Sequence, residues 1–171
     1  MRRVITFHDA SALIYLIEGA EPFATGLRKK LTAVVKRHPD IGGAISRLSW
    51  LERRVGPMKS QDSAILARYD AILERTDLVW VELTQRVVEL AAAILVQTGL
   101  KTPDALQAAS CLQLGCEHWF LTGESAFRRF SGLNGKVLGV SDRRTPRTAE
   151  RVAAASSCRP GKAVPRKPGR R

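Results

Sequence analysis

Short apolar runs alternate with longer segments of helical periodicity along most of the chain. Runs rich in β-branched and aromatic residues are typical of strands buried on both faces of a sheet, and they occur at residues 4–7, 41–45, 78–83, 118–121 and, as an edge strand, 136–140. The segments between them carry apolar residues three and four positions apart, which predicts helices. This alternation predicts an α/β domain, a three-layer α/β/α sandwich with a mostly parallel central sheet.

Capping residues indicate where several of these helices begin and end. Ser46 is expected to be the N-cap of a helix over residues 47–55, and the Gly-Pro pair at 56–57 is expected to end it. The run Thr-Pro-Asp at 102–104 predicts another helix start, with the threonine hydroxyl as N-cap, proline in the first position and an acid in the first turn.

Charge divides the chain into two parts. The net charge is +12, and residues 143–171 contribute most of it, with ten Lys and Arg against one Glu. The apolar periodicity also dissolves there, so we expect a folded domain over 1–142 and a basic, disordered tail over 143–171. Such a polycation attracts phosphate backbones by counterion release, although a solvated tail without a partner explains it equally well.

Composition excludes several other classes of protein. No stretch approaches the roughly 20 apolar residues that span a membrane, and the N-terminus lacks the apolar core of a signal peptide. Three cysteines at irregular spacing argue against a disulfide framework, so we expect a cytoplasmic protein. Cys111, Cys116 and His118 lack a standard zinc spacing and a fourth ligand, which favours core thiols over a zinc site.

Four carboxylates share one kind of position in this pattern. Asp9 follows the first strand and Glu124 the fourth, while Glu52 lies in the helix after the second strand and Asp104 in the first turn of a helix. Because parallel strands deliver their following loops to one edge of the sheet, we expect the four acids to meet there. Taken singly, each is explained as well by a helix cap, a charge near a helix N-terminus or a solvated face.

Four carboxylates in one place repel each other, so either some of them bind protons or a cation neutralises them. The hard ions Mg²⁺ and Mn²⁺ prefer such all-oxygen ligands. An ion of this kind generates hydroxide from bound water and stabilises charge on a phosphoryl group. Metal-dependent phosphodiester cleavage therefore follows as a hypothesis, with the four acids as catalytic and metal-binding residues.

Four blocks of sequence carry these acids. They are HDASALIYL with Asp9 and Ser11, ISRLSWLERRVGP with Glu52, LKTPDALQAAS with Asp104, and FLTGESAF with Thr122 and Glu124. In order, spacing and flanking residues the blocks resemble the PIN domain family, and more narrowly the VapC-type toxins of bacterial toxin–antitoxin pairs. The resemblance covers residues 4–140.

The resemblance implies an Mg²⁺- or Mn²⁺-dependent endoribonuclease that cuts RNA to halt translation. It also implies a homodimeric toxin, held inactive by a cognate antitoxin whose C-terminal segment covers the acidic cleft. Asp9, Glu52 and Asp104 carry over as metal-binding catalytic acids. Thr122 would orient a ligand through its hydroxyl, and Ser11 would do the same or only cap a helix.

One block departs from the family pattern. The family more often has Thr-Asn-Asp where this chain has Thr122-Gly123-Glu124. Glutamate keeps the negative charge but is one methylene longer, which changes the geometry offered to a second metal ion.

Two basic residues and one histidine near these acids also bear on function. Arg53 and Arg54 follow Glu52 and either contact RNA phosphates or belong to a solvated helix face. His8 is expected to be packed or hydrogen-bonded rather than a general base. The alternative function is a catalytically impaired PIN-like module that binds nucleic acid with its basic tail. A phosphotransfer domain with Asp9 as nucleophile is disfavoured, because Ser11 stands where a second acid is wanted.

Overall fold

A parallel sheet of five strands lies at the centre of the computed structural model, which describes residues 4–115, 117–130, 133 and 138–139. The strands are β1 (Val4–His8), β2 (Gly42–Ser46), β3 (Leu78–Val81), β4 (Glu117–Thr122) and β5 (Leu138–Gly139). Their order across the sheet is β3-β2-β1-β4-β5, and each neighbouring pair is parallel. The predicted α/β class with a parallel central sheet is confirmed.

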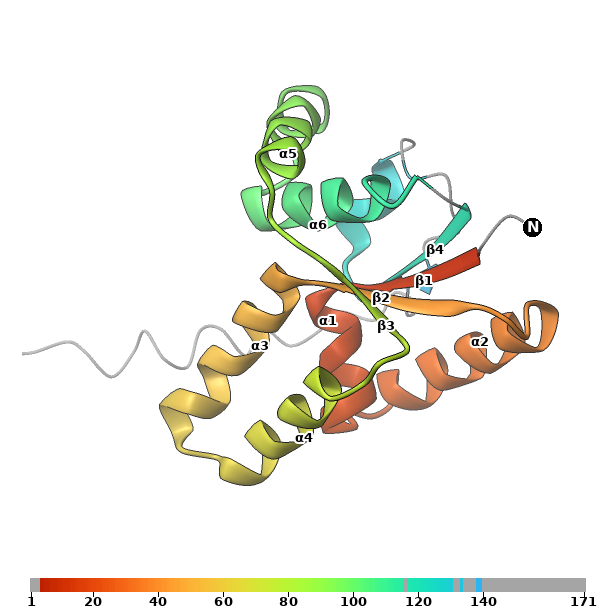
Figure 1. The fold of residues 1–171 in the computed structure, drawn as a ribbon, viewed down its shortest axis with the longest axis vertical. Coiled ribbons are helices and arrows are strands. Elements are labelled where there is room, and N and C mark those ends of the chain that lie inside the picture. The colour runs from red at the N-terminus through yellow and green to blue at the C-terminus, as the bar shows by residue number, and fades with distance from the viewer. Residues whose placement is uncertain (1–3, 116, 131–132, 134–137, 140–171) are drawn as a thin grey trace, which may run out of the picture. The chain divides into compact units, whose positions relative to one another are not determined.

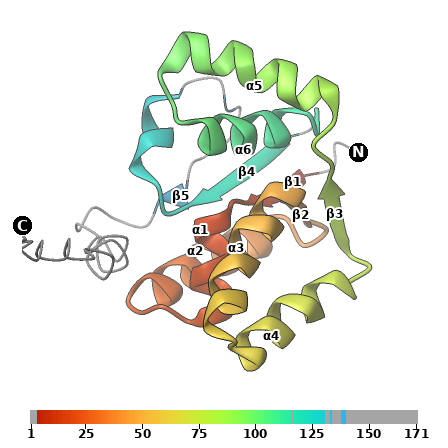
Figure 2. The same cartoon turned by 90° about the vertical axis from the view of Figure 1, so that its left-hand side faces the viewer.

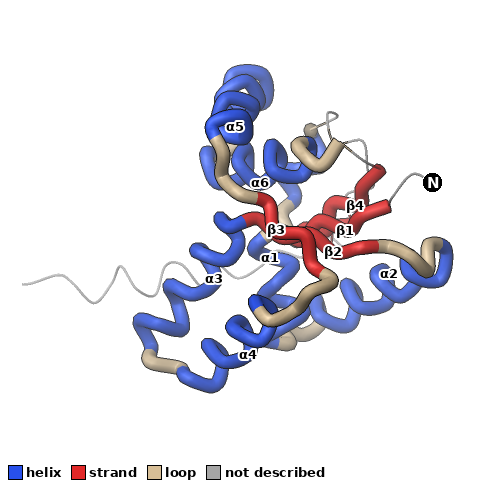
Figure 3. Tube along the Cα trace, in the orientation of Figure 1, coloured by secondary structure: helices blue, strands red, loops and turns tan. Residues whose placement is uncertain are grey.

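Helices cover both faces of this sheet. They are α1 (Ala10–Leu13), α2 (Phe23–Arg37), α3 (Arg47–Ser60), α4 (Ser63–Leu73), α5 (Gln85–Thr98) and α6 (Thr102–Leu112), with a π-helical turn η1 (Ile14–Glu18) after α1 and a 3-10 turn η2 (Ser125–Arg129) after β4. Helices α5 and α6 lie on one face, and α1 to α4 on the other (Figures 1 and 2). Figure 3 shows the strands between these two helical layers, which is the predicted three-layer arrangement.

The two faces of the sheet bury different side chains because neighbouring strand residues point to opposite sides. Ile5 and Phe7 of β1 belong to the cluster that α5 and α6 cover. Phe7 stacks on Phe120 of β4, with ring centroids 5.5 Å apart. Full burial of such side chains stabilises a fold by about 1.5–3 kcal/mol each. Their packing therefore fixes β1 and β4, which bear two of the four acids at their ends.

Helix α3 does not end at the Gly56-Pro57 pair, so that prediction is wrong. Proline removes one hydrogen bond from a helix interior, yet α3 continues to Ser60 and ends at Gln61, which has a left-handed φ of 56°. Contacts with the next helix outweigh this local preference. Arg54 donates a hydrogen bond to Asp70 of α4 at 2.7 Å, with its guanidinium over the Trp50 ring.

Other boundaries differ by smaller amounts. Thr102 is the first residue of α6 rather than its N-cap, which is Lys101, and no side chain caps this helix. Ser46 does cap α3, as expected, by accepting a hydrogen bond from the Ser49 N–H. Within the described ranges, no helix has the length and apolar character needed to cross a bilayer. All described residues belong to one compact unit, Met1–Ser141, whereas the predicted tail over 143–171 lies outside the described residues.

Candidate active site

Asp9 lies where β1 ends, at the carboxyl edge of the sheet. Its N–H donates to the Leu121 carbonyl of β4 at 3.1 Å, so the parallel ladder positions its backbone. The carboxylate Oδ1 accepts hydrogen bonds from the Ala12 N–H and the Ser11 hydroxyl, both at 2.8 Å, and Oδ2 accepts one from the Thr122 hydroxyl at 2.5 Å. The residue is only 3% exposed. Asp9 is thus a buried carboxylate in a fixed orientation, and at the same time the N-cap of α1.

The Ser11 and Thr122 hydroxyls join Asp9 to the turn after β4. Ser11 Oγ accepts a hydrogen bond from the Gly123 N–H at 2.7 Å, and Thr122 Oγ1 accepts one from the Glu124 N–H at 2.9 Å. Each hydroxyl therefore donates to Asp9 and accepts from the backbone of the 122–124 turn. This reciprocal arrangement brings Glu124, which is exposed, to the edge where Asp9 lies.

Burial opposes the negative charge of Asp9. Desolvation raises the pKa of Asp9 from 3.8 to about 6, even though its three hydrogen bonds act in the opposite direction. The charge of Glu124 raises this pKa further. In the protein alone, Asp9 is therefore a carboxylate that a nearby cation would stabilise.

Gln107 of α6 positions the carboxylate of Glu52, one acid of a second pair. The Gln107 amide donates to Glu52 Oε2 at 3.2 Å, and its carbonyl oxygen accepts hydrogen bonds from the hydroxyls of Ser46 at 2.8 Å and Ser49 at 3.0 Å. Gln107 is buried, and one helical turn separates it from Asp104. Sequence reasoning missed Gln107, although its spacing of three from Asp104 places both on one helix face.

The charges of Glu52 and Asp104 interact. Burial raises the pKa of Glu52, the Gln107 hydrogen bond and Arg53 lower it, and the charge of Asp104 raises it. Burial also raises the pKa of Asp104, against the effect of Lys101. Both acids are half-buried, so burial destabilises their ionised forms, as it does for Asp9.

The predicted acids therefore interact as two pairs. Asp9 interacts electrostatically with Glu124, and Glu52 with Asp104. The Ser49 hydroxyl has one proton for two acceptors, the Gln107 side-chain oxygen at 3.0 Å and the His8 carbonyl oxygen at 3.4 Å, and so lies between the two pairs. In the part of the chain that the structure describes, no three His, Cys, Asp or Glu side chains form a metal-binding group. A single site containing all four acids remains a prediction.

The donor chemistry at Asp9 fits a hard divalent ion. A carboxylate offers about four lone-pair positions, and the hydrogen bonds of Asp9 to described residues use two on Oδ1 and one on Oδ2. In the part of the chain that the structure describes, no donor uses the second lone pair of Oδ2, which is where a cation would bind. Oxygen ligands of this kind suit Mg²⁺ and Mn²⁺.

The two arginines after Glu52 lie in different surroundings. Arg54 pairs with Asp70 and stacks over Trp50, which joins α3 to α4. Arg53 has a buried Nε without a hydrogen-bond partner among the described residues, and its charge acts on Glu52. Of the two, Arg53 is the one with donor capacity near the acids.

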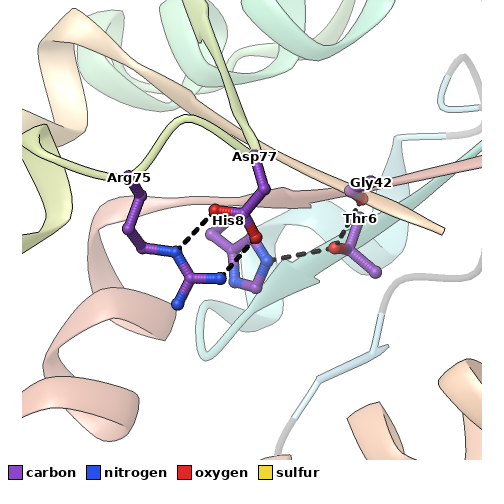
Figure 4. A network of polar contacts seen from close by, with 5 residues as sticks. All are labelled: Thr6, His8, Gly42, Arg75 and Asp77. Carbon is purple, nitrogen blue, oxygen red and sulfur yellow. Dashed lines mark hydrogen bonds and ion pairs between the residues drawn. The ribbon is translucent and has the colours of Figure 1, made fainter.

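His8 faces a separate cavity of about 390 Å³ on the side of the sheet that α1, α2 and α4 cover. The Thr6 hydroxyl donates to the Gly42 carbonyl at 3.1 Å, so it accepts a hydrogen bond from His8 Nε2–H, also at 3.1 Å (Figure 4). Burial lowers the pKa of His8 to about 4, and the charge of Arg75, which pairs with Asp77, lowers it too. His8 is thus a neutral, hydrogen-bonded histidine, as expected.

These features define a parallel three-layer α/β/α domain in which a buried aspartate lies at the carboxyl edge of the sheet. The family model described as "PIN domain" matches residues 6–133, and the chain belongs to this family. Nucleases that depend on a divalent metal ion are typical of it. None of the curated proteins matches the chain.

Solved structures with a similar fold include three toxin–antitoxin proteins. VapBC-1 from nontypeable Haemophilus influenzae has a TM-score of 0.59 and 18% identity, covering 78% of this chain and 98% of that one. VapBC2 from Rickettsia felis, bound to a DNA fragment from its promoter, has a TM-score of 0.58 and 18% identity, covering 78% and 96%. A toxin–antitoxin complex from Klebsiella pneumoniae has a TM-score of 0.53 and 22% identity, covering 77% and 95%. At these identities the likeness establishes the fold.

Proposed function

We propose that this protein is an endoribonuclease that requires Mg²⁺ or Mn²⁺, and that it is the toxin of a toxin–antitoxin pair. The observation that carries the proposal is the buried Asp9 carboxylate. Three donors hold it at the carboxyl edge of the sheet, no further described residue donates to it, and the charge of Glu124 acts on it. This arrangement in a PIN domain supports a metal-dependent nuclease.

Each acid has a role in this proposal. Asp9, Glu52, Asp104 and Glu124 would hold the metal ion, which when bound supplies a hydroxide and stabilises charge on the scissile phosphate. Ser11 and Thr122 orient the Asp9 carboxylate through their hydroxyls. Gln107 restrains the Glu52 carboxylate in the same way. These positioning groups keep the acids in place before substrate arrives, so that little reorganisation is needed.

Basic groups would bind the RNA backbone. Arg53 is half-buried and its charge acts on Glu52, so its guanidinium would pair with a phosphate oxygen beside the acids. The ten Lys and Arg of residues 143–171 would add affinity without sequence preference.

The proposed protein partners are a cognate antitoxin and a second copy of this chain. The similar solved structures are themselves toxin–antitoxin proteins. Helix α3 also exposes an apolar stripe of Leu51, Val55 and Met58, which are four and three positions apart and so share one helix face. Their exposed fractions are 60%, 41% and 57%. A stripe of this kind is typical of a helix that packs against another protein.

The test is cleavage of a structured RNA by the full chain, with Mn²⁺ and with EDTA. Wild-type protein should cleave with Mn²⁺ only, and Asp9→Asn should abolish cleavage. Asp40→Asn, which changes an exposed acid outside the site, should retain it. RNA binding without cleavage, weakened by salt and by deletion of residues 143–171, would instead support the alternative, a catalytically impaired module that binds nucleic acid.

A further inference from the structure

Tyr15 lies against Gly123 at the acidic edge, although the sequence pattern does not distinguish it. The residue belongs to the π-helical turn η1, and its ring stacks on Phe23 with centroids 5.1 Å apart. A Cβ added at Gly123 would lie 2.5 Å from Tyr15 Cε2 and 2.6 Å from the Tyr15 hydroxyl oxygen. Since the backbone of Gly123 does not have a positive φ, it is the tyrosine ring that leaves room only for glycine here.

The Tyr15 hydroxyl is close to the acids of the Asp9 pair. Burial raises the pKa of Tyr15, and the charges of Glu124 and Asp9 raise it further. Two other hydroxyls at this edge, those of Ser11 and Thr122, already donate their protons to Asp9. Among the described residues no hydrogen bond engages the Tyr15 hydroxyl, so its proton is available to a ligand.

We propose that Tyr15 binds the substrate, with its hydroxyl donating a hydrogen bond to a phosphate oxygen of the RNA strand beside Asp9. Carboxylates and phosphates are both acceptors, so a strand lying along an acidic edge needs donors as well as a cation. A half-buried phenol held by Phe23 and Gly123 supplies one without adding charge. The inference rests on the proposed nuclease function and extends it to how the protein binds the RNA backbone.

The first test compares two tyrosine-to-phenylalanine variants in steady-state RNA cleavage with Mn²⁺. Tyr15→Phe should raise KM about tenfold at unchanged kcat, because a hydrogen bond to a charged group is lost from binding alone. Tyr69→Phe is the matched control, since the Tyr69 hydroxyl donates to Glu18 at 2.6 Å, and it should leave KM unchanged. An unchanged KM for Tyr15→Phe, or a fall in kcat at constant KM, would overturn the proposal.

The second test uses the contact with Gly123. Gly123→Ala should raise KM about as much as Tyr15→Phe, because the new methyl group displaces the ring. In a Tyr15→Ala background the same change should have no further effect on KM. Gly56→Ala is the control, since a Cβ there meets no atom within 4 Å. A normal KM for Gly123→Ala, or additive effects in the double variant, would contradict the inference.

Folding is followed for each variant by urea unfolding, so that an unstable protein is not read as a loss of binding. If Gly123→Ala unfolds alone and folds in the Tyr15→Ala background, the contact is supported and Tyr15→Phe decides the role of the hydroxyl. Wild-type protein that cleaves no RNA would remove the proposed function together with this inference. Cleavage by wild type with a normal KM for Tyr15→Phe would remove only the inference.

Discussion

Replacing Asp9 with asparagine is expected to stabilise the metal-free protein at neutral pH, although it removes the central acid of the candidate site. Asparagine has nearly the same shape, and its carbonyl oxygen can still accept from Ala12 and Ser11. Its amide would face Thr122 Oγ1, which can accept because its own proton is no longer needed by a carboxylate. Two of the three hydrogen bonds are therefore retained and the third is reversed in direction, while the buried charge is lost.

The magnitude follows from the pKa of Asp9, which burial raises from 3.8 to about 6. A raised pKa means that the folded state binds a proton more tightly than the unfolded state does. The stabilisation by Asp9 is thus complete below about pH 4 and is lost as the pH rises through 6. At about 1.4 kcal/mol per pH unit, the asparagine variant should be more stable by about 2–3 kcal/mol above pH 7, with little difference below pH 4.

The assay is urea unfolding of wild type and Asp9→Asn from about pH 4 to about pH 8 in EDTA. Asp40→Asn is the control and should differ little from wild type, because it changes an exposed acid. Added Mn²⁺ should then stabilise wild type, by about 2.7 kcal/mol at a hundredfold excess over Kd, but not Asp9→Asn. The reasoning fails if the variant is less stable than wild type in EDTA above pH 7, or if the difference between them does not change with pH.

Three further outcomes are expected. In an Asp9→Asn background, stability should fall by up to about 3 kcal/mol as the pH drops from 6.5 to 4, because the unfolded chain protonates His8 before the folded chain does; His8→Gln should flatten this slope in urea unfolding. Gln107→Leu should lower stability by about 1–3 kcal/mol and weaken Mn²⁺ binding in calorimetry, since it leaves buried hydroxyls and Glu52 without their partner. Pro57→Ala should raise the free energy of unfolding in urea by about 1–3 kcal/mol, and an unchanged free energy would show that α3 accommodates proline without loss.

Local signals account for much of what the sequence predicted. Asp9 was placed at a strand end by the apolar run before it and the helical spacing after it, and Ser46 was identified as a cap from its position alone. Both depend on residues only a few positions apart. The parallel order of the strands follows from helical connections of this length. The sheet and the edge that carries the acids could therefore be predicted.

Contacts between distant segments could not be predicted in this way. The amide of Gln107 meets Glu52 across 55 positions of sequence, and nothing in the local pattern of either helix requires that contact. Gly123 was noted only as a departure from a family pattern, whereas the structure gives its reason in the ring of Tyr15. The continuation of α3 past Pro57 also depends on a tertiary contact, because Arg54 of α3 pairs with Asp70 of the following helix α4.

The choice of aspartate at position 9 is not explained by capping alone. An acidic N-cap ordinarily benefits from the helix dipole, by about 0.3–1 kcal/mol. At Asp9 burial outweighs this benefit and raises the pKa to about 6. On the neighbouring strand, Ser46 caps α3 with a neutral hydroxyl at the corresponding strand end. Asp9→Ser should therefore keep α1 capped and keep the chain folded while it abolishes Mn²⁺-dependent cleavage. Retained cleavage in that variant would mean that the acid at position 9 is only a cap.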